Sequence, residues 1–341
     1  MMQEKRNSAI SCCRVVSMLM IVLCHVIAKY TFIPGHTFLG QVLNVGVYTF
    51  LSISGFLYGS RTIPNVFTWL GKRFIAVVFP SWIMAVCVIL WEFLVGNHIS
   101  PFTIAVYLLG AQGLGFVFPG FYRYFAEIKV LGPLWFITVI MLCYCILPLL
   151  QRYRDRLSGS KQFLTFALLT STLSFILALK CGVILFYFLT FAIGYFLAAS
   201  NHRHALRKRP FIGATVLMAV SQTVRIVLML LFDGTPFYQT YTYFSHMILG
   251  IWIMCFFLAL QQIIPVLIDR LAGSPVMAVA DNMSMYIYLT HYCFCRGTLD
   301  MYQIFDNLLL ATLTFTAAVL LSALILKKLV ETLMLCLKLK K

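Results

Sequence analysis

Long runs of apolar residues, separated by short polar stretches, recur along the whole chain. A helix needs about 20 predominantly apolar residues to cross a bilayer. The pattern predicts ten membrane-spanning helices, at 9–30, 38–60, 73–95, 132–151, 162–179, 183–200, 211–232, 243–264, 276–296 and 307–326. We therefore expect an all-α, polytopic membrane protein with both termini on the same side.

One further apolar stretch, from Ser100 to Gly120, is interrupted by three internal glycines. Counting it as an eleventh span would move the basic loops at 152–161 and 203–209 to the side opposite the N-terminus. With ten spans, 19 of the 26 lysines and arginines lie on one side, which the positive-inside rule makes cytoplasmic. We therefore predict a re-entrant or interfacial segment near 100–118 and two cytoplasmic termini.

Composition agrees with a membrane-embedded chain, since 62% of the residues are hydrophobic and 11% are charged. The 26 basic residues exceed the 10 acidic ones, but they gather in short loops, so no nucleic-acid partner is expected. The eleven cysteines have no metal-ligand spacing, and no metal is expected. The first apolar run carries an arginine and lacks a signal-peptide cleavage site. We predict one membrane domain at 8–330 and a basic cytoplasmic tail at 331–341.

Arg14 and His25 lie eleven residues apart inside the first predicted span. At about 100° and 1.5 Å per residue, they point within about 20° of one another and lie about 16 Å apart along the axis. One helix face therefore carries a permanent cation and a titratable imidazole, and ionisable groups within a bilayer usually serve function. The structural alternative is that Arg14 snorkels to the interface and His25 is a packing residue.

Four other residues of the predicted spans are site candidates that also have a structural interpretation. Lys72 and Arg73 begin the third span, where two cations suit the phosphate groups of a cofactor or lipid but equally orient the span. Ser54 belongs to a small-residue stretch that suits close helix packing. Trp135 falls at the predicted outer interface, where aromatic residues are common.

The ninth predicted span carries a second histidine, His291. Tyr288 lies three residues before it and therefore shares its helix face. Asp281 lies nearer the cytoplasmic end of the same span. Ionisable groups at such positions are difficult to explain by packing alone, so Tyr288 and His291 are candidates for lining a substrate passage.

Five motifs occur in order on this ten-span frame: Arg-x10-His from Arg14, Ser-Gly-Phe-Leu from Ser54, Lys-Arg…Pro-x-Trp from Lys72, Leu-Trp-Phe…Tyr…Pro from Leu134, and Ser-x-x-x-Tyr-Leu-x-His ending at His291. Together they resemble acyltransferase family 3, the bacterial multispanning membrane acyltransferases that modify surface glycans. The resemblance covers about residues 8 to 330. Two positions depart from it, since Ser11 stands where many members carry aspartate and Ile140 where many carry glutamate.

The resemblance implies an enzyme of the bacterial cytoplasmic membrane that moves an acyl group, usually acetyl, from cytoplasmic acetyl-CoA to a hydroxyl of a cell-surface or lipid-linked polysaccharide. The essential pair of the family corresponds to Arg14 and His25, and its basic residues for the coenzyme phosphates correspond to Lys72 and Arg73. We expect the substrate passage to be lined by His291, Tyr288, Trp135 and Ser54.

A transporter of an anionic solute or glycolipid remains the alternative, because buried cations and histidines serve transport equally well. Against it, the chain shows no pair of broken helices in matched halves, a feature that inverted-repeat transporters often have. Transfer of label from acetyl-CoA to a glycan would distinguish the enzyme from the transporter.

Overall fold

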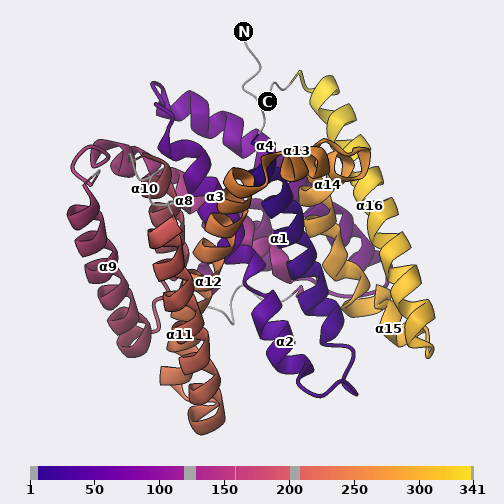
Figure 1. Cartoon of the computed structure of the whole chain (residues 1–341). Helices are drawn as coiled ribbons and strands as arrows, with labels where there is room; N and C mark the ends of the chain where they lie inside the picture. The colour runs from indigo at the N-terminus through magenta and orange to yellow at the C-terminus, as the bar shows by residue number, and fades with distance from the viewer. Residues whose placement is uncertain (1–6, 119–127, 158, 200–207, 339–341) are drawn as a thin grey trace. The chain divides into compact units, whose positions relative to one another are not determined.

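The computed structural model describes residues 7–118, 128–157, 159–199 and 208–338, and this part of the chain contains helices and no strand (Figure 1). The basic residues at 203–207 and the last three residues of the predicted tail lie outside the described residues. Eight helical segments are long and apolar enough to cross a membrane: Ser8–Ile27, His36–Gly59, Val66–Leu94, Lys129–Arg152, Lys161–Cys181, Phe211–Phe232, Pro236–Ile263 and Leu308–Cys336. The protein is therefore an all-α, polytopic membrane protein, as the hydrophobic pattern predicts.

Two of the ten predicted spans form shorter helices. α10 (Phe186–Ala199) has 14 residues and α14 (Pro275–Thr290) has 16. At 1.5 Å per residue these helices are about 21 and 24 Å long, less than the ~30 Å hydrocarbon thickness of a typical bilayer. α14 continues directly into a short 3-10 helix, η4 (His291–Phe294), so the predicted ninth span changes its helix type at His291.

The segment near 100–118 does not form a continuous span. It folds as two short helices, α5 (Pro101–Leu108) and α6 (Leu114–Val117). Gly110 separates them with a φ of +65°, a left-handed conformation that glycine adopts without steric cost. At the other end of the chain, α16 (Leu308–Cys336) continues beyond the predicted span and into the predicted tail.

The chain forms two compact units. The first unit comprises Met1–Met20, Asn44–Thr62 and Ile146–Asn282, and the second comprises Ile21–Leu43, Ile63–Cys145 and Met283–Lys341. α1 (Ser8–Ile27), α8 (Trp135–Arg152) and α14 each contribute residues to both units. The chain crosses between the units within these three helices and also at 43–44 and 62–63.

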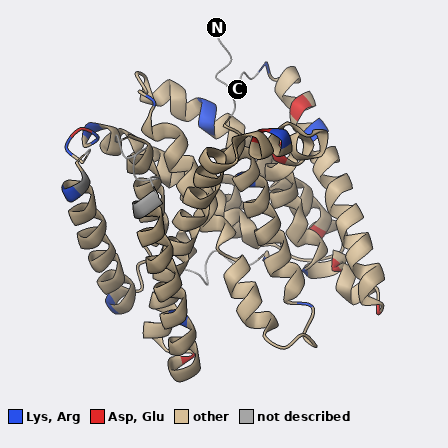
Figure 2. Ribbon diagram, viewed as in Figure 1, with Lys and Arg blue, Asp and Glu red and all other residues tan. Residues whose placement is uncertain are grey.

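In the first unit, α3 (Gly46–Gly59) packs against α10 and α12 (Pro236–Ile263), and α12 also packs against α9 (Ser160–Cys181) and α11 (Lys208–Phe232). A short helix, α13 (Pro265–Gly273), follows α12. Figure 2 shows that the lysines of α9 lie at its two ends and leave the middle uncharged, as expected of a span.

Arg225 is a cation inside a span of this unit, as Arg14 also is. Arg225 of α11 is 1% exposed, and its Nε donates a hydrogen bond to Oε1 of Gln222 over 3.0 Å. Nε2 of Gln222 in turn donates to the backbone oxygen of Ser245 on α12 over 3.1 Å. The bond of Gln222 connects α11 to α12, and Arg225 is bonded to Gln222.

Glycines allow α3 and α10 to approach one another closely. A Cβ atom added to Gly55 would overlap the backbone oxygen of Phe191 and lie 2.8 Å from the backbone nitrogen of Tyr195. Small residues at helix interfaces are typical of membrane proteins, where van der Waals packing drives helix association.

We expect Gly55→Val to lower the thermal stability of the purified protein in detergent, because α3 and α10 must separate. Overpacking of this kind costs about 1–3 kcal/mol, and more where the backbone must move. Gly213→Val is the matched control, since Gly213 of α11 has no atom within 4 Å of its added Cβ. Equal melting temperatures for the two variants would contradict the close approach of α3 and α10.

In the second unit, α4 (Val66–Leu94) packs against α16 and η2 (Lys129–Leu134), and η4 packs against η2 and α16. The short elements α2 (His36–Leu43), η5 (Gly297–Leu299) and α15 (Met301–Ile304) also belong to this unit, as do α5 and α6. Because η4 has neighbours on several sides, its first residue, His291, is held in the interior of the unit.

Candidate functional site

A single helix, α1, carries both Arg14 and His25. The side chain of Asn7 accepts a hydrogen bond from the backbone N–H of Ile10 over 3.2 Å and so caps the start of the helix. Arg14 belongs to the part of α1 in the first unit and His25 to the part in the second unit. The surroundings of the two residues are therefore described separately.

In the first unit, Arg14 forms an ion pair with Asp281 of α14. Nη1 of Arg14 lies 3.0 Å from Oδ1 of Asp281, and the side chains are 30% and 1% exposed. The buried carboxylate is thereby compensated, as buried charges require. A guanidinium has five N–H donors, so pairing with Asp281 is compatible with binding a second anion on the exposed side.

In the second unit, two histidines meet. The ring centroids of His25 and His291 lie 5.4 Å apart with an interplanar angle of 28°. The ring of Tyr292 meets His25 edge-on at 4.7 Å. His25 is half-buried, whereas His291 is fully buried. The two histidines that the sequence singled out in the first and ninth spans therefore belong to one cluster.

Hydrogen bonds hold His291 and Tyr288 in place. Nδ1 of His291 lies 2.6 Å from the backbone oxygen of Tyr288, and the two rings lie 5.7 Å apart. The hydroxyl of Tyr288 donates to the backbone oxygen of Pro133 in η2. Nε2 of His291 is buried and meets no hydrogen-bond partner among the described residues.

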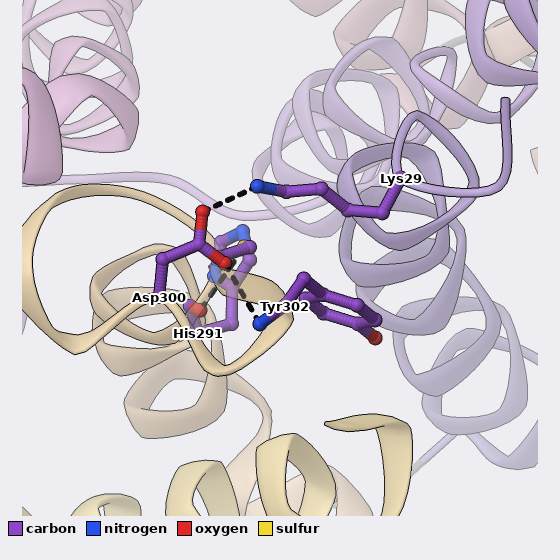
Figure 3. A network of polar contacts seen from close by, with 5 residues as sticks. Lys29, His291, Asp300 and Tyr302 are labelled. Carbon is purple, nitrogen blue, oxygen red and sulfur yellow. Dashed lines mark hydrogen bonds and ion pairs between the residues drawn. The ribbon is translucent and has the colours of Figure 1, made fainter. Parts of the chain in front are cut away.

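A buried ion pair lies beyond the end of α1. Lys29 pairs with Asp300, whose side chain is 1% exposed and also accepts a hydrogen bond from the backbone N–H of Tyr302 over 3.1 Å (Figure 3). Burial raises the pKa of Tyr302 to about 12, so the phenol stays neutral beside this pair. The pair connects the residues that follow α1 to the turn that begins α15.

Trp135, at the start of α8, is linked to the histidine cluster by aromatic contacts within the second unit. Its ring stacks on Phe116 at 4.8 Å and lies 6.3 Å from Phe136. Phe136 meets Tyr288 edge-on at 5.6 Å, and Tyr288 neighbours His291. Trp135 thus belongs to a continuous aromatic chain that leads to His291.

The glycine-broken segment is bonded to the same end of α8. Gln112 donates a hydrogen bond to the backbone oxygen of Leu134 over 3.1 Å, and the backbone N–H of Gly113 donates to the hydroxyl of Thr138 over 3.0 Å. These bonds fix the position of Phe116, which covers the ring of Trp135.

Of the other predicted site residues, Lys72 and Arg73 lie on α4 in the second unit, and Ser54 lies half-buried on α3 in the first. Lys72 is exposed. Arg73 is half-buried, and its Nε is enclosed without a hydrogen-bond partner among the described residues. In the described part of the chain, no group of three or more His, Cys, Asp or Glu side chains could hold a metal ion.

The second unit also contains an apolar groove of about 250 Å³. It is lined by residues of α4 and α16, among them Val88 and Leu326, and also by Thr290 and Cys293. Thr290 directly precedes His291 in the chain, so the groove reaches the residues that flank the histidine cluster.

A family model described as an acyltransferase domain, the acyltransferase 3 family, matches residues 7–327, which is nearly the whole chain. The chain belongs to the acyltransferase 3 family. No curated protein and no solved structure matches it. The match favours an enzyme over the transporter that the sequence alone left open.

The membrane acyltransferase therefore presents two polar constellations, the Arg14–Asp281 pair in its first unit and the His25–His291 cluster in its second. Imidazoles accept protons and act as nucleophiles, and a guanidinium binds anions and polarises carbonyl groups, so the acyltransferase holds groups suited to acyl transfer.

Two residues of these constellations, and Asp300 of the separate pair with Lys29, were not identified as site residues from the sequence. Asp281 was noted but given no role, while Tyr292 and Asp300 were not considered. An acidic residue inside an apolar run is a recognisable signal for Asp281, whereas Asp300 lies between two predicted spans and carries no such signal. No such signal exists for Tyr292, since the spacing along the chain does not reveal its contact with His25.

Proposed function

We propose that this acyltransferase moves an acetyl group from acetyl-CoA to a hydroxyl of a cell-surface or lipid-linked polysaccharide. The observation that carries the proposal is the contact between His25 and His291 inside an apolar unit of a family member. Acyl transfer to an alcohol needs a base for the hydroxyl proton or a nucleophile that takes up the acyl group, and an imidazole supplies either.

Arg14 would bind the coenzyme or polarise the thioester carbonyl, where negative charge develops during the reaction. Its side chain is 30% exposed while its partner Asp281 is buried, so part of the Arg14 side chain stays accessible beside the ion pair. The proposed orientation, in a bacterial cytoplasmic membrane with both termini inside, gives Arg14 a place near the cytoplasmic supply of coenzyme.

Lys72 and Arg73 would hold the phosphate groups of the coenzyme. Adjacent cations suit phosphates, which accept several charge-assisted hydrogen bonds. The enclosed Nε of Arg73, without a described partner, supports this proposal, because a buried donor that stays unpaired is costly and a phosphate oxygen would satisfy it.

The test is transfer of label from labelled acetyl-CoA in membranes that contain the protein, with lipid-linked glycans of a bacterial host as acceptor. We expect base-labile label in the glycan, as an O-acetyl ester gives. If the glycan stays unlabelled while a known transferase labels it in parallel, the proposed acceptor or donor is wrong. Solute uptake by vesicles without coenzyme A would then favour the transporter.

The apolar groove supports the lipid-linked form of the acceptor, because its apolar walls suit a hydrocarbon chain next to the histidine cluster. The lipid tails around the protein are as apolar as the groove, so the hydrophobic effect does not favour binding. The favourable free energy of binding comes from van der Waals packing and from positioning of the chain. Cys87 is one of the residues that line the groove, so we expect Cys87→Trp, which would fill part of it, to raise the KM for a lipid-linked acceptor several-fold.

The same variant should leave the KM for a water-soluble oligosaccharide unchanged. Leu90→Trp is the control, since Leu90 lies on the same helix, is 57% exposed and does not line the groove. An equal rise in KM for both kinds of acceptor, or for both variants, would show that the groove does not bind the lipid chain.

A further inference from the structure

The hydrogen bond of His291 fixes the position of its ring proton. A backbone carbonyl can only accept hydrogen bonds, so Nδ1, 2.6 Å from the backbone oxygen of Tyr288, carries the hydrogen. In a neutral imidazole the other nitrogen then holds a lone pair. Nε2 of His291 is therefore a hydrogen-bond and proton acceptor.

This acceptor is buried and meets no donor among the described residues. A buried polar atom left without a partner costs about 1–3 kcal/mol, and most such atoms in proteins are satisfied. The cost is removed when a hydroxyl donor arrives at Nε2. The apolar groove is lined by Thr290 and Cys293, the neighbours of His291 on either side in the sequence, although His291 itself does not line it.

Unlike His291, His25 has no hydrogen bond to a described residue that would orient its ring. It is half-buried and meets His291 and Tyr292 through ring contacts, and no described residue donates a hydrogen bond to it or accepts one from it. Catalytic bases are typically oriented by a third group that holds the imidazole in one tautomer. In the described part of the chain, only His291 of this pair has such a group.

The surroundings also make His291 rigid. The backbone oxygen of Tyr288 accepts the hydrogen bond from Nδ1 of His291. The hydroxyl of the same tyrosine donates to the backbone oxygen of Pro133, which holds Tyr288 in place. The thiol of Cys295 donates to the backbone oxygen of His291 over 3.4 Å. Oγ1 of Thr290 donates to the backbone oxygen of Tyr286 over 3.0 Å. A fixed imidazole suits a proton transfer, since the transfer depends on geometry.

We propose that His291 is the general base that removes the proton from the acceptor hydroxyl, which leaves His25 to donate a hydrogen bond to the carbonyl oxygen of the thioester, where negative charge develops. The proposal rests on the acyl transfer proposed above. In the step, the hydroxyl oxygen forms a bond to the carbonyl carbon of the thioester while its proton moves to Nε2. The carbon–sulfur bond then breaks, and the thiolate takes the proton from the His291 imidazolium, which returns it to the neutral form.

His291→Asn separates this chemical role from a structural one. The side-chain amide of asparagine can donate to the backbone oxygen of Tyr288 in place of Nδ1, but asparagine has no counterpart of Nε2. Removal of a general base lowers the rate by about a hundredfold to ten-thousandfold. We expect kcat for transfer from acetyl-CoA to the glycan to fall by that factor, with the KM for acetyl-CoA unchanged.

Hydroxylamine provides the second measurement, because its neutral nitrogen attacks a thioester without prior deprotonation. The purified His291→Asn protein should keep the wild-type rate of acetyl hydroxamate formation, after subtraction of the rate without protein. His291→Gln is the second variant if asparagine prevents folding. Its amide can accept a hydrogen bond but cannot carry the proton, so it should show the same pattern.

Two results would overturn the assignment. Full transfer to the glycan by His291→Asn would leave His291 a structural residue. Equal loss of glycan and hydroxylamine transfer by a folded variant would show that His291 does not act on the hydroxyl proton. By contrast, a wild-type protein inert toward both nucleophiles would contradict the proposed function itself.

Discussion

Replacing His25 with alanine is expected to abolish label transfer from acetyl-CoA to the glycan, while the protein stays folded in the membrane. Loss of an imidazole that takes part in the chemistry lowers the rate of transfer by about a hundredfold to ten-thousandfold. The fold should tolerate the change, because His25 is half-buried and meets its neighbours through ring contacts. The measurement is initial transfer rate per amount of membrane-inserted protein.

His36→Ala is the matched control for this variant. His36 is also half-buried in the second unit, and its Nδ1 lies 3.1 Å from the backbone oxygen of Ile33. The proposed mechanism gives His36 no role. It should transfer label at the wild-type rate. A His25→Ala protein that retains activity, or a His36→Ala protein that loses it equally, would remove His25 from the proposed mechanism.

Prediction from sequence succeeded where local pattern decides the structure. The first span was expected at 9–30 and forms Ser8–Ile27, because length and hydropathy alone define such a helix. The interrupted segment near 100–118 was expected not to span, and Gly110 breaks it into two short helices. The spans expected at 183–200 and 276–296 are shorter helices, since hydropathy does not show where a helix ends or becomes a 3-10 turn.

Contacts between distant segments could not be predicted in the same way. His25 and His291 were each singled out, yet nothing in the spacing within either span indicates that their rings meet. Arg14 and Asp281 are 267 positions apart, and Asp281 was noted without a partner. Charge alone would have suggested that a buried carboxylate needs a cation, but several cations were available, and only the packing of the helices selects one.

Arg14→Ala is expected to raise the apparent KM for acetyl-CoA with a smaller effect on kcat. A hydrogen bond to a charged group contributes about 1.5–3 kcal/mol, which corresponds to a rise of about tenfold to a hundredfold. Arg14→Lys should not fully restore the KM, because an ammonium group lacks the planar fork of a guanidinium. Steady-state kinetics with varied acetyl-CoA concentration measure both effects.

The ion pair with Asp281 adds a second consequence, which must be separated from the first. Arg14→Ala leaves a buried carboxylate without this cation, and breaking a buried pair costs up to about 3–5 kcal/mol, less here because Arg14 is 30% exposed. Asp281→Asn removes that charge, so the double variant Arg14→Ala/Asp281→Asn should regain thermal stability relative to Arg14→Ala. Its KM for acetyl-CoA should stay raised. If the second substitution also restored the KM, Arg14 would act only by neutralising Asp281, and the coenzyme would have to be bound by other cations.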